Sequence, residues 1–181
     1  MGKTIVINLF GAPGSGKSTA MAYIFAKLKM RGVNCEMAPE FAKELYFEEN
    51  LTAFRNQPYI FGTQYYRVCR LLNKVDVIVT DSPVFVSVYY NNLNFAKDEF
   101  SDYVIQTSKT FNNRNYYLNR VTKYDTNGRH QSEEQAKEVG NTLLSLFEKN
   151  DIEFTYADSR PETLDKIVDE IVEEINNKWI I

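Results

Sequence analysis

A glycine-rich segment close to the N-terminus, Gly11-Ala12-Pro13-Gly14-Ser15-Gly16-Lys17-Ser18-Thr19, constrains the fold of this 181-residue chain more than any other feature. It follows an apolar run from Thr4 to Phe10 that predicts a strand, and a segment with apolar residues at helical spacing follows it. In that context the pattern predicts a phosphate-binding loop (P-loop) between a first strand and a first helix.

Each residue type in the predicted loop has a physical reason. Glycines let successive backbone N–H groups turn toward phosphate oxygens, and the helix N-terminus adds a positive dipole. Lys17 would neutralise charge at the γ-phosphate, and the Ser18 hydroxyl would bind Mg²⁺. We therefore expect residues 11–19 to bind a nucleoside triphosphate together with Mg²⁺.

Apolar runs alternate with segments of helical period along the whole chain, which predicts an α/β protein with a parallel sheet. Residues 1–181 are long enough for one domain and too short for two. The expected strands are Thr4–Phe10, Val33–Met37, Val75–Thr80, Tyr116–Leu118 and Ile152–Tyr156. Helices are expected after the loop, at Tyr59–Asn73, Val84–Tyr90 and Lys97–Phe111, from a Ser132 and Gln135 capping box to Lys149, and at the C-terminus.

Composition argues against several classes of protein. A net charge of -3 and a pI near 5.3 argue against holding nucleic acid by bulk positive charge, although they allow a local basic strip. Two distant cysteines, Cys35 and Cys69, favour neither a disulfide framework nor a zinc site. The short N-terminal apolar run is unlike a signal peptide, so we expect a cytoplasmic protein that does not contact a membrane.

Two acidic residues follow predicted strands, at the carboxyl edge where a parallel sheet binds ligands. Asp81, in Thr80-Asp81-Ser82-Pro83, is interpreted as a Mg²⁺ ligand through water or as the acceptor of a hydroxyl proton. The same sequence also suits a helix N-cap. Glu40 follows the second strand and would orient or deprotonate an acceptor hydroxyl, or simply favour a helix N-terminus.

A polar stretch at about residues 120–131 predicts a lid. Arg120 and Arg129, with Lys123 and Arg114 nearby, would suit charge spread over a transferring phosphoryl group, and solvated surface cations are the alternative.

One helix carries candidates for an acceptor pocket, in which aromatic rings would stack on a flat base and amide groups would hydrogen-bond to the edge of that base. They are Gln57, Phe61, Gln64, Tyr65 and Arg67, and for Phe61 and Tyr65 core packing is the favoured interpretation.

A P-loop alone does not separate kinases from GTPases or motor ATPases. Asn73-Lys74-Val75-Asp76 and Asp125-Thr126-Asn127-Gly128 mimic GTPase motifs, but they occur in the reverse order. A motor ATPase usually ends a strand with paired acidic residues, whereas the third strand here ends with Asp81 alone. These features favour a kinase.

The chain resembles the nucleoside and nucleotide kinase branch of P-loop proteins, and it is similar to the nicotinamide riboside kinase-like kinases often found in bacteriophages. The resemblance covers about residues 5–158. Beyond the P-loop, Gln64 and Asp81, it rests on residues 40–44, Glu-Phe-Ala-Lys-Glu, which are similar to E-Y-x-R-E. It also includes residues 128–131, Gly-Arg-His-Gln, which are similar to G-R-x-Q. Phe41 and Lys43 depart from the family's tyrosine and arginine.

The resemblance implies a three-layer α/β/α P-loop NTPase fold with a five-stranded parallel sheet in the order 2-3-1-4-5, and a closing lid. It also implies ATP as donor and an acidic residue near the acceptor hydroxyl. The expected acceptor is a nucleoside-like or nucleotide-like small molecule. Two alternatives stay open: a kinase of 5-hydroxymethyluracil in phage DNA, and a non-kinase ATPase or nucleotide-binding regulator. The C-terminal residues 179–181 would dock either on the core or on a second copy in a homodimer.

Overall fold

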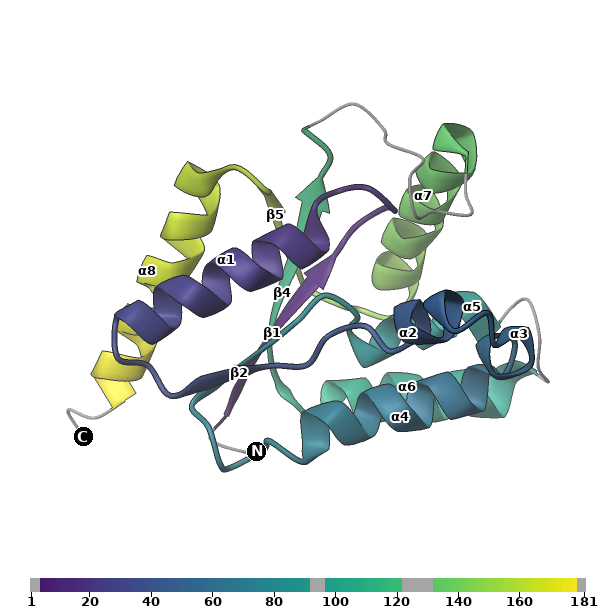
Figure 1. The fold of residues 1–181 in the computed structure, drawn as a ribbon, viewed down its shortest axis with the longest axis horizontal. Coiled ribbons are helices and arrows are strands. Elements are labelled where there is room, and N and C mark those ends of the chain that lie inside the picture. The colour runs from purple at the N-terminus through teal and green to yellow at the C-terminus, as the bar shows by residue number, and fades with distance from the viewer. Residues whose placement is uncertain (1–3, 92–96, 122–131, 179–181) are drawn as a thin grey trace.

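The structure, a computed structural model, describes residues 4–91, 97–121 and 132–178. Five strands form one parallel sheet in the order β2-β3-β1-β4-β5 (Figure 1). They are β1 (Ile5–Phe10), β2 (Cys35–Met37), β3 (Val77–Thr80), β4 (Asn112–Asn119) and β5 (Thr155–Asp158). Both the expected α/β/α P-loop NTPase fold and the expected strand order are confirmed.

Helices cover both faces of the sheet. On one face α1 (Lys17–Met30) packs beside α8 (Pro161–Lys178), as Figure 1 shows. The other face is covered by α4 (Gln57–Cys69), α6 (Lys97–Lys109) and α7 (Glu133–Lys149). The shorter helices are α2 (Ala42–Phe47), α3 (Leu51–Phe54), the 3₁₀ turn η1 (Val84–Val86) and α5 (Ser87–Asn91). In the described part of the chain, no helix has the length and apolar character needed to cross a bilayer.

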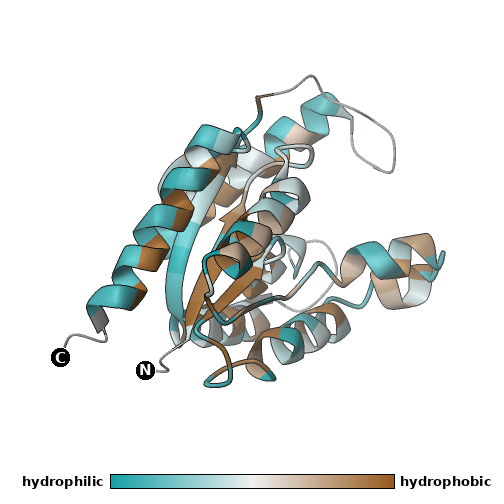
Figure 2. Ribbon diagram, turned by 60° about the vertical axis from the view of Figure 1, so that its left-hand side comes forward, coloured by the Kyte–Doolittle hydropathy of each residue, from teal (hydrophilic) through white to brown (hydrophobic). Residues whose placement is uncertain are grey.

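The sheet divides the core into two layers, because successive side chains of a strand point to opposite faces. From the central strand β1, Ile5, Ile7 and Leu9 pack toward α1 and α8, whereas Val6 and Phe10 pack toward α4, α6 and α7. Figure 2 shows the same arrangement: hydrophobic strands lie inside, and the outer face of α8 is hydrophilic. A strand buried on both faces needs a nearly continuous apolar sequence, which is why β1 was predictable.

Strand β4 is longer than predicted. It spans eight residues rather than three, because its first half is polar and gave no apolar run. Asn8 of β1 explains how such a sequence can lie inside a sheet: its amide donates to Oδ1 of Asn113 at 2.7 Å and of Asn115 at 2.9 Å. Buried polar groups are tolerated when they are hydrogen-bonded to one another, so this part of the sheet is held by an asparagine cluster.

Other element boundaries differ from the prediction by a few residues. Strand β5 begins at Thr155 rather than at Ile152, because Ile152 and Phe154 pack into the core before pairing with β4 begins. Helix α4 ends at Cys69 rather than at Asn73, and the chain turns with Asn73 at a positive φ of 60°. The predicted capping box at the start of α7 is confirmed.

The aromatic cluster beneath α7 offers a test of the core. Phe147 is completely buried, and its ring centroid lies 4.7 Å from Phe10 and 5.1 Å from Phe154. We expect Phe147→Ala to lower the free energy of unfolding by about 3–5 kcal/mol, because it leaves a cavity among rigid rings. The control Phe47→Ala removes a ring that is 68% exposed and should cost less than about 0.5 kcal/mol. Urea denaturation followed by circular dichroism would measure both, and equal losses would contradict this account.

Candidate nucleotide and acceptor site

The P-loop connects the carboxyl end of β1 to the first turn of α1, and its glycines Gly11, Gly14 and Gly16 all have a positive φ. Gly11 has a φ of 139°, and a Cβ atom there would lie 2.6 Å from the carbonyl oxygen of Leu118. Gly16 has a φ of 88°, and a Cβ atom there would lie 2.7 Å from Ser159 in the loop after β5. The loop is therefore confined between β4 and the segment that leads into α8.

The loop offers donors and positive charge that suit a triphosphate. No side chain caps the N-terminus of α1, and the first turn of that helix holds no acidic residue. The Lys17 ammonium donates to the carbonyl oxygens of Gly11 at 2.9 Å and of Ala12 at 3.2 Å, which holds it over the loop. The Ser15 hydroxyl is buried without a hydrogen-bond partner in the described structure. A helix N-terminus with these neighbours fits the phosphates of a nucleotide.

Ser18 and Asp81, predicted as metal-binding residues, are in direct contact. The Ser18 hydroxyl donates to Oδ2 of Asp81 at 2.6 Å, and Asp81 is 4% exposed at the carboxyl end of β3. Hydroxyl and carboxylate oxygens are ligands that suit Mg²⁺. No group of three or more histidine, cysteine or acidic side chains that could hold a metal occurs among the described residues. Mg²⁺ usually keeps several water ligands and binds one or two carboxylates together with substrate phosphates, which suits a site that offers Ser18 and Asp81.

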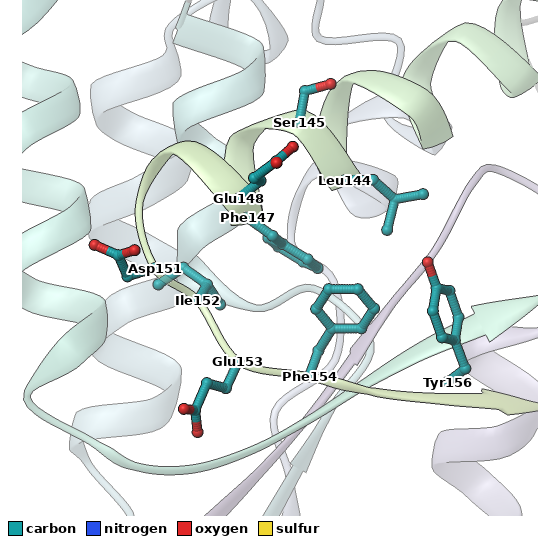
Figure 3. A pocket seen from close by; sticks show the side chains of 9 residues that line it. All are labelled: Leu144, Ser145, Phe147, Glu148, Asp151, Ile152, Glu153, Phe154 and Tyr156. Carbon is teal, nitrogen blue, oxygen red and sulfur yellow. The ribbon is translucent and has the colours of Figure 1, made fainter.

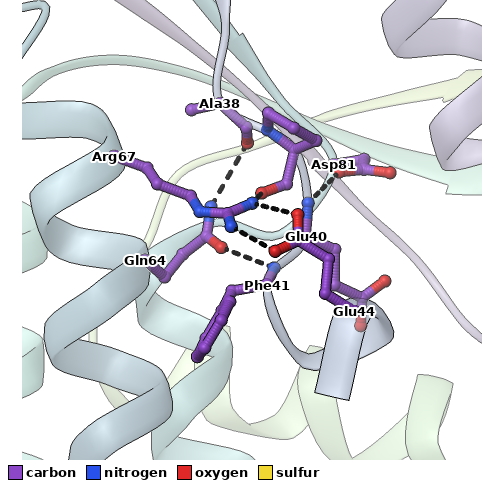
Figure 4. Close-up of polar contacts among 8 residues, drawn as sticks. Ala38, Glu40, Phe41, Glu44, Gln64, Arg67 and Asp81 are labelled. Carbon is purple, nitrogen blue, oxygen red and sulfur yellow. Dashed lines mark hydrogen bonds and ion pairs between the residues drawn. The ribbon is translucent and has the colours of Figure 1, made fainter. Parts of the chain in front are cut away.

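The structure also brings Glu40 to this site. Its backbone N–H donates to Oδ1 of Asp81 at 3.0 Å (Figure 4). Because Asp81 also accepts from Ser18, one carboxylate contacts both the P-loop helix and the segment after β2. The half-buried position of Glu40 raises its pKa, first because burial disfavours the charged form and then through the negative charge of Asp81. Lys17 and Lys43 oppose this rise. Glu40 thus has the environment of a general base.

Tyr90, on α5, is a neighbour of Glu40 that sequence reasoning missed. Its pKa is raised by burial and then by the negative charge of Glu40 and by Tyr89. The phenol therefore keeps its proton and can donate a hydrogen bond beside the Glu40 carboxylate. In the sequence Tyr90 ends an apolar and aromatic segment, which carries no signal of a polar role.

The predicted acceptor-pocket residues are held mainly by protein contacts. Phe61 is 4% exposed, and its ring centroid lies 5.8 Å from that of Tyr65 and 5.5 Å from that of Phe100. Phe61 is therefore a core residue, as the favoured interpretation expected. Gln64 is 3% exposed and bonds to backbone groups after β2. Arg67 makes a bidentate ion pair with Glu44. For Gln64 and Arg67, direct contact with an acceptor stays a prediction.

The structure describes only some of the cations that were predicted for the lid. Arg120 follows β4, and its guanidinium donates to Glu133 at the start of α7 at 2.8 Å. Arg129, Lys123 and most of the stretch 120–131 lie outside the described residues. Arg114 pairs with Glu174 of α8, where it fastens the sheet to that helix rather than facing the P-loop.

A cavity of about 530 Å³ lies elsewhere, between the C-terminal end of α7 and the segment that enters β5 (Figure 3). Phe147, Phe154 and Tyr156 form its apolar side, with acidic residues around them. Ligands of open parallel sheets bind at the carboxyl ends of the strands, whereas this cavity flanks the beginning of β5. We therefore separate it from the nucleotide site.

Fold and site together define a P-loop protein of the nucleotide-binding NTPase and kinase class. A family model described as an AAA domain matches residues 6–162, and the chain belongs to this family. The match begins in β1, includes the P-loop, Glu40 and Asp81, and ends in the first turn of α8. No curated protein shows a significant match to the chain.

Proposed function

We propose that the protein is a kinase that transfers the γ-phosphoryl group of ATP to a hydroxyl of a nucleoside-like or nucleotide-like acceptor. One observation carries the proposal: the Glu40 carboxyl group, with a raised pKa, lies beside the Asp81 carboxylate that contacts Ser18 of the P-loop. A nucleotide-binding regulator would not require a second acidic side chain at this position. A kinase requires such a group to receive the proton of the acceptor hydroxyl.

The two carboxylates differ in how they are occupied. Both oxygens of Asp81 accept hydrogen bonds, from the Ser18 hydroxyl and from the Glu40 amide. The Glu40 carboxylate accepts none from the residues that the structure describes, so it is available to a substrate. We therefore assign Glu40 as the base and Asp81 as the residue that holds Mg²⁺ with Ser18.

The proposed step is an in-line displacement. The acceptor hydroxyl gives its proton to Glu40 as its oxygen bonds to the γ-phosphorus, and the bond from that phosphorus to the β,γ-bridging oxygen breaks to release ADP. Lys17 and the N–H groups of the P-loop stabilise the negative charge on the transferring group. When bound, Mg²⁺ neutralises charge on the β- and γ-phosphate oxygens. Most of the catalysis is positioning and electrostatics.

Transfer from ATP labelled in the γ-phosphate would test the proposal. The acceptors would be nucleosides, nucleoside monophosphates, nicotinamide riboside and DNA containing 5-hydroxymethyluracil. We expect label in a small acceptor. Label only in the modified DNA would favour the alternative function, a kinase of 5-hydroxymethyluracil in DNA. Label only in free phosphate would contradict a kinase and favour an ATPase.

The proposed base predicts a pH dependence. Glu40 must be deprotonated to act, and burial together with Asp81 raises its pKa. The rate of transfer should therefore fall as the pH falls through a value above the usual carboxyl range near 4.3. Measuring kcat/KM for the acceptor between pH 4 and pH 8 would show this limb. An ordinary or lowered midpoint would argue against Glu40 as the base.

A further inference from the structure

The segment after β2, residues 38–41, bonds to β3 through the Ala38 N–H, which donates to the Val79 carbonyl oxygen at 2.9 Å, and side chains bond to several of its other peptide groups; we call it the Glu40 loop. Its polar backbone groups can be followed one after another in Figure 4. The Ala38 carbonyl accepts from Thr80 Oγ1 at 2.7 Å and from Gln64 Nε2 at 3.2 Å, and the Pro39 carbonyl accepts from Arg67 at 3.0 Å. A loop with its peptide groups bonded in this way has few alternative conformations.

Gln64 uses both ends of its amide on this loop. Besides donating to Ala38, its Oε1 accepts from the N–H of Phe41 at 3.0 Å. Because the residue is 3% exposed, water cannot replace these bonds. A primary amide is the side-chain group that donates and accepts on fixed atoms, so neither leucine nor glutamate reproduces the pair of bonds.

Arg67 lies one helical turn after Gln64, so both side chains leave the same side of α4. Its guanidinium forms a bidentate pair with Glu44 of α2 at 2.9 and 2.6 Å, and it lies 5.1 Å from the centre of the Phe41 ring. The same guanidinium donates to Pro39. Arg67 therefore connects α4 to both ends of the Glu40 loop, a geometry for which lysine is a poor substitute.

We propose that Gln64 and Arg67 are positioning residues, which set the place of the Glu40 carboxylate beside the P-loop through their bonds to the Glu40 loop. Asp81 holds the loop from the opposite side through the Glu40 amide. The kinetic part of this proposal rests on the proposed role of Glu40 as base. Small displacements of a catalytic group are costly, and a shift of about 1 Å lowers a rate by about 10²-fold.

Two variants test the proposal kinetically, with a matched control. Gln64→Leu and Arg67→Ala should lower kcat for phosphoryl transfer, Gln64→Leu by about 10²-fold, while the KM for ATP stays near the wild-type value. Arg67→Lys should restore little of the loss. The control Arg31→Ala removes an exposed ion pair between α1 and Asp169 of α8 and should leave kcat unchanged.

Amide exchange in the central strand separates positioning from a general loss of stability. A partly unfolded population would also lower kcat, but it would speed exchange in β1 as well as in the Glu40 loop. We expect the β1 amides to exchange at the wild-type rate in Gln64→Leu and Arg67→Ala.

Amide hydrogen exchange gives a readout that does not need kinase activity. The Glu40 amide keeps its partner, Asp81, in both variants, so its exchange reports on the loop rather than on a deleted bond. We expect it to exchange about tenfold faster in Gln64→Leu and Arg67→Ala, and at the wild-type rate in Arg31→Ala. Unchanged exchange, or unchanged kcat in an active enzyme, would overturn the proposal. If wild-type protein transfers phosphate to no acceptor, the proposed function fails, and the exchange rates still decide whether α4 holds the loop.

Discussion

Replacing Lys17 by alanine is expected to lower phosphoryl transfer on the order of 10²-fold to 10³-fold while the protein stays folded. The Lys17 ammonium is held over the P-loop by the carbonyl oxygens of Gly11 and Ala12. It is thus in place before the γ-phosphoryl group gains charge in the transition state. A preorganised donor of this kind stabilises the transition state more than the ground state, so its loss should appear in kcat. Initial rates at saturating ATP and acceptor would measure it.

The matched control is Lys29→Ala, which removes a lysine from the same helix. Lys29 is exposed and makes a 3.4 Å ion pair with Glu36, away from the loop, so we expect an unchanged kcat. Thermal unfolding of each variant would verify that the fold persists. Undiminished transfer by Lys17→Ala would remove the P-loop lysine from the mechanism.

The parts of the fold that were predictable depend on local signals. Strand β1 has a continuous apolar sequence, and the P-loop has its fixed residues within one short segment. The strand order followed from the resemblance, since pairing between β1 and β3 joins residues about seventy positions apart that no local pattern connects. The first half of β4 was missed because its burial depends on Asn8, in a different strand.

The candidate site shows the same division. Ser18 and Asp81 were placed together from the sequence, because both follow strands that end at one edge of the sheet. For Gln64 the residue type is visible in the sequence and suggests an acceptor contact, which stays a prediction, whereas its bonding partners in the fold are not visible there. Those partners are backbone groups 23 and 26 residues away. Tyr90 shows the same limit, because its position beside Glu40 arises only when α5 packs near the loop after β2.

Glu40→Gln tests the second large effect, the loss of the proposed base. General-base catalysis contributes typically 10²–10⁴-fold, and we expect kcat to fall by about that factor. The substitution keeps the shape of the side chain and leaves the backbone bond from residue 40 to Asp81 intact, so the loop should not move. Because glutamine does not titrate, the residual activity should also lose the acid limb that burial and Asp81 produce in the wild type.

The control for this prediction is Glu36→Gln, which removes an exposed carboxylate of β2. Glu36 contacts Lys29 rather than the site, so its removal should change neither kcat nor the pH profile. If Glu40→Gln kept the acid limb and most of the activity, the proton would have to go to another group. Asp81 would then be the base, and its bonds to Ser18 and to the Glu40 amide would have to rearrange in the complex with substrate. Glu40→Gln thus distinguishes the two carboxylates, because it removes the carboxylate of residue 40 and leaves the bonds of Asp81 to Ser18 and to the residue 40 amide in place.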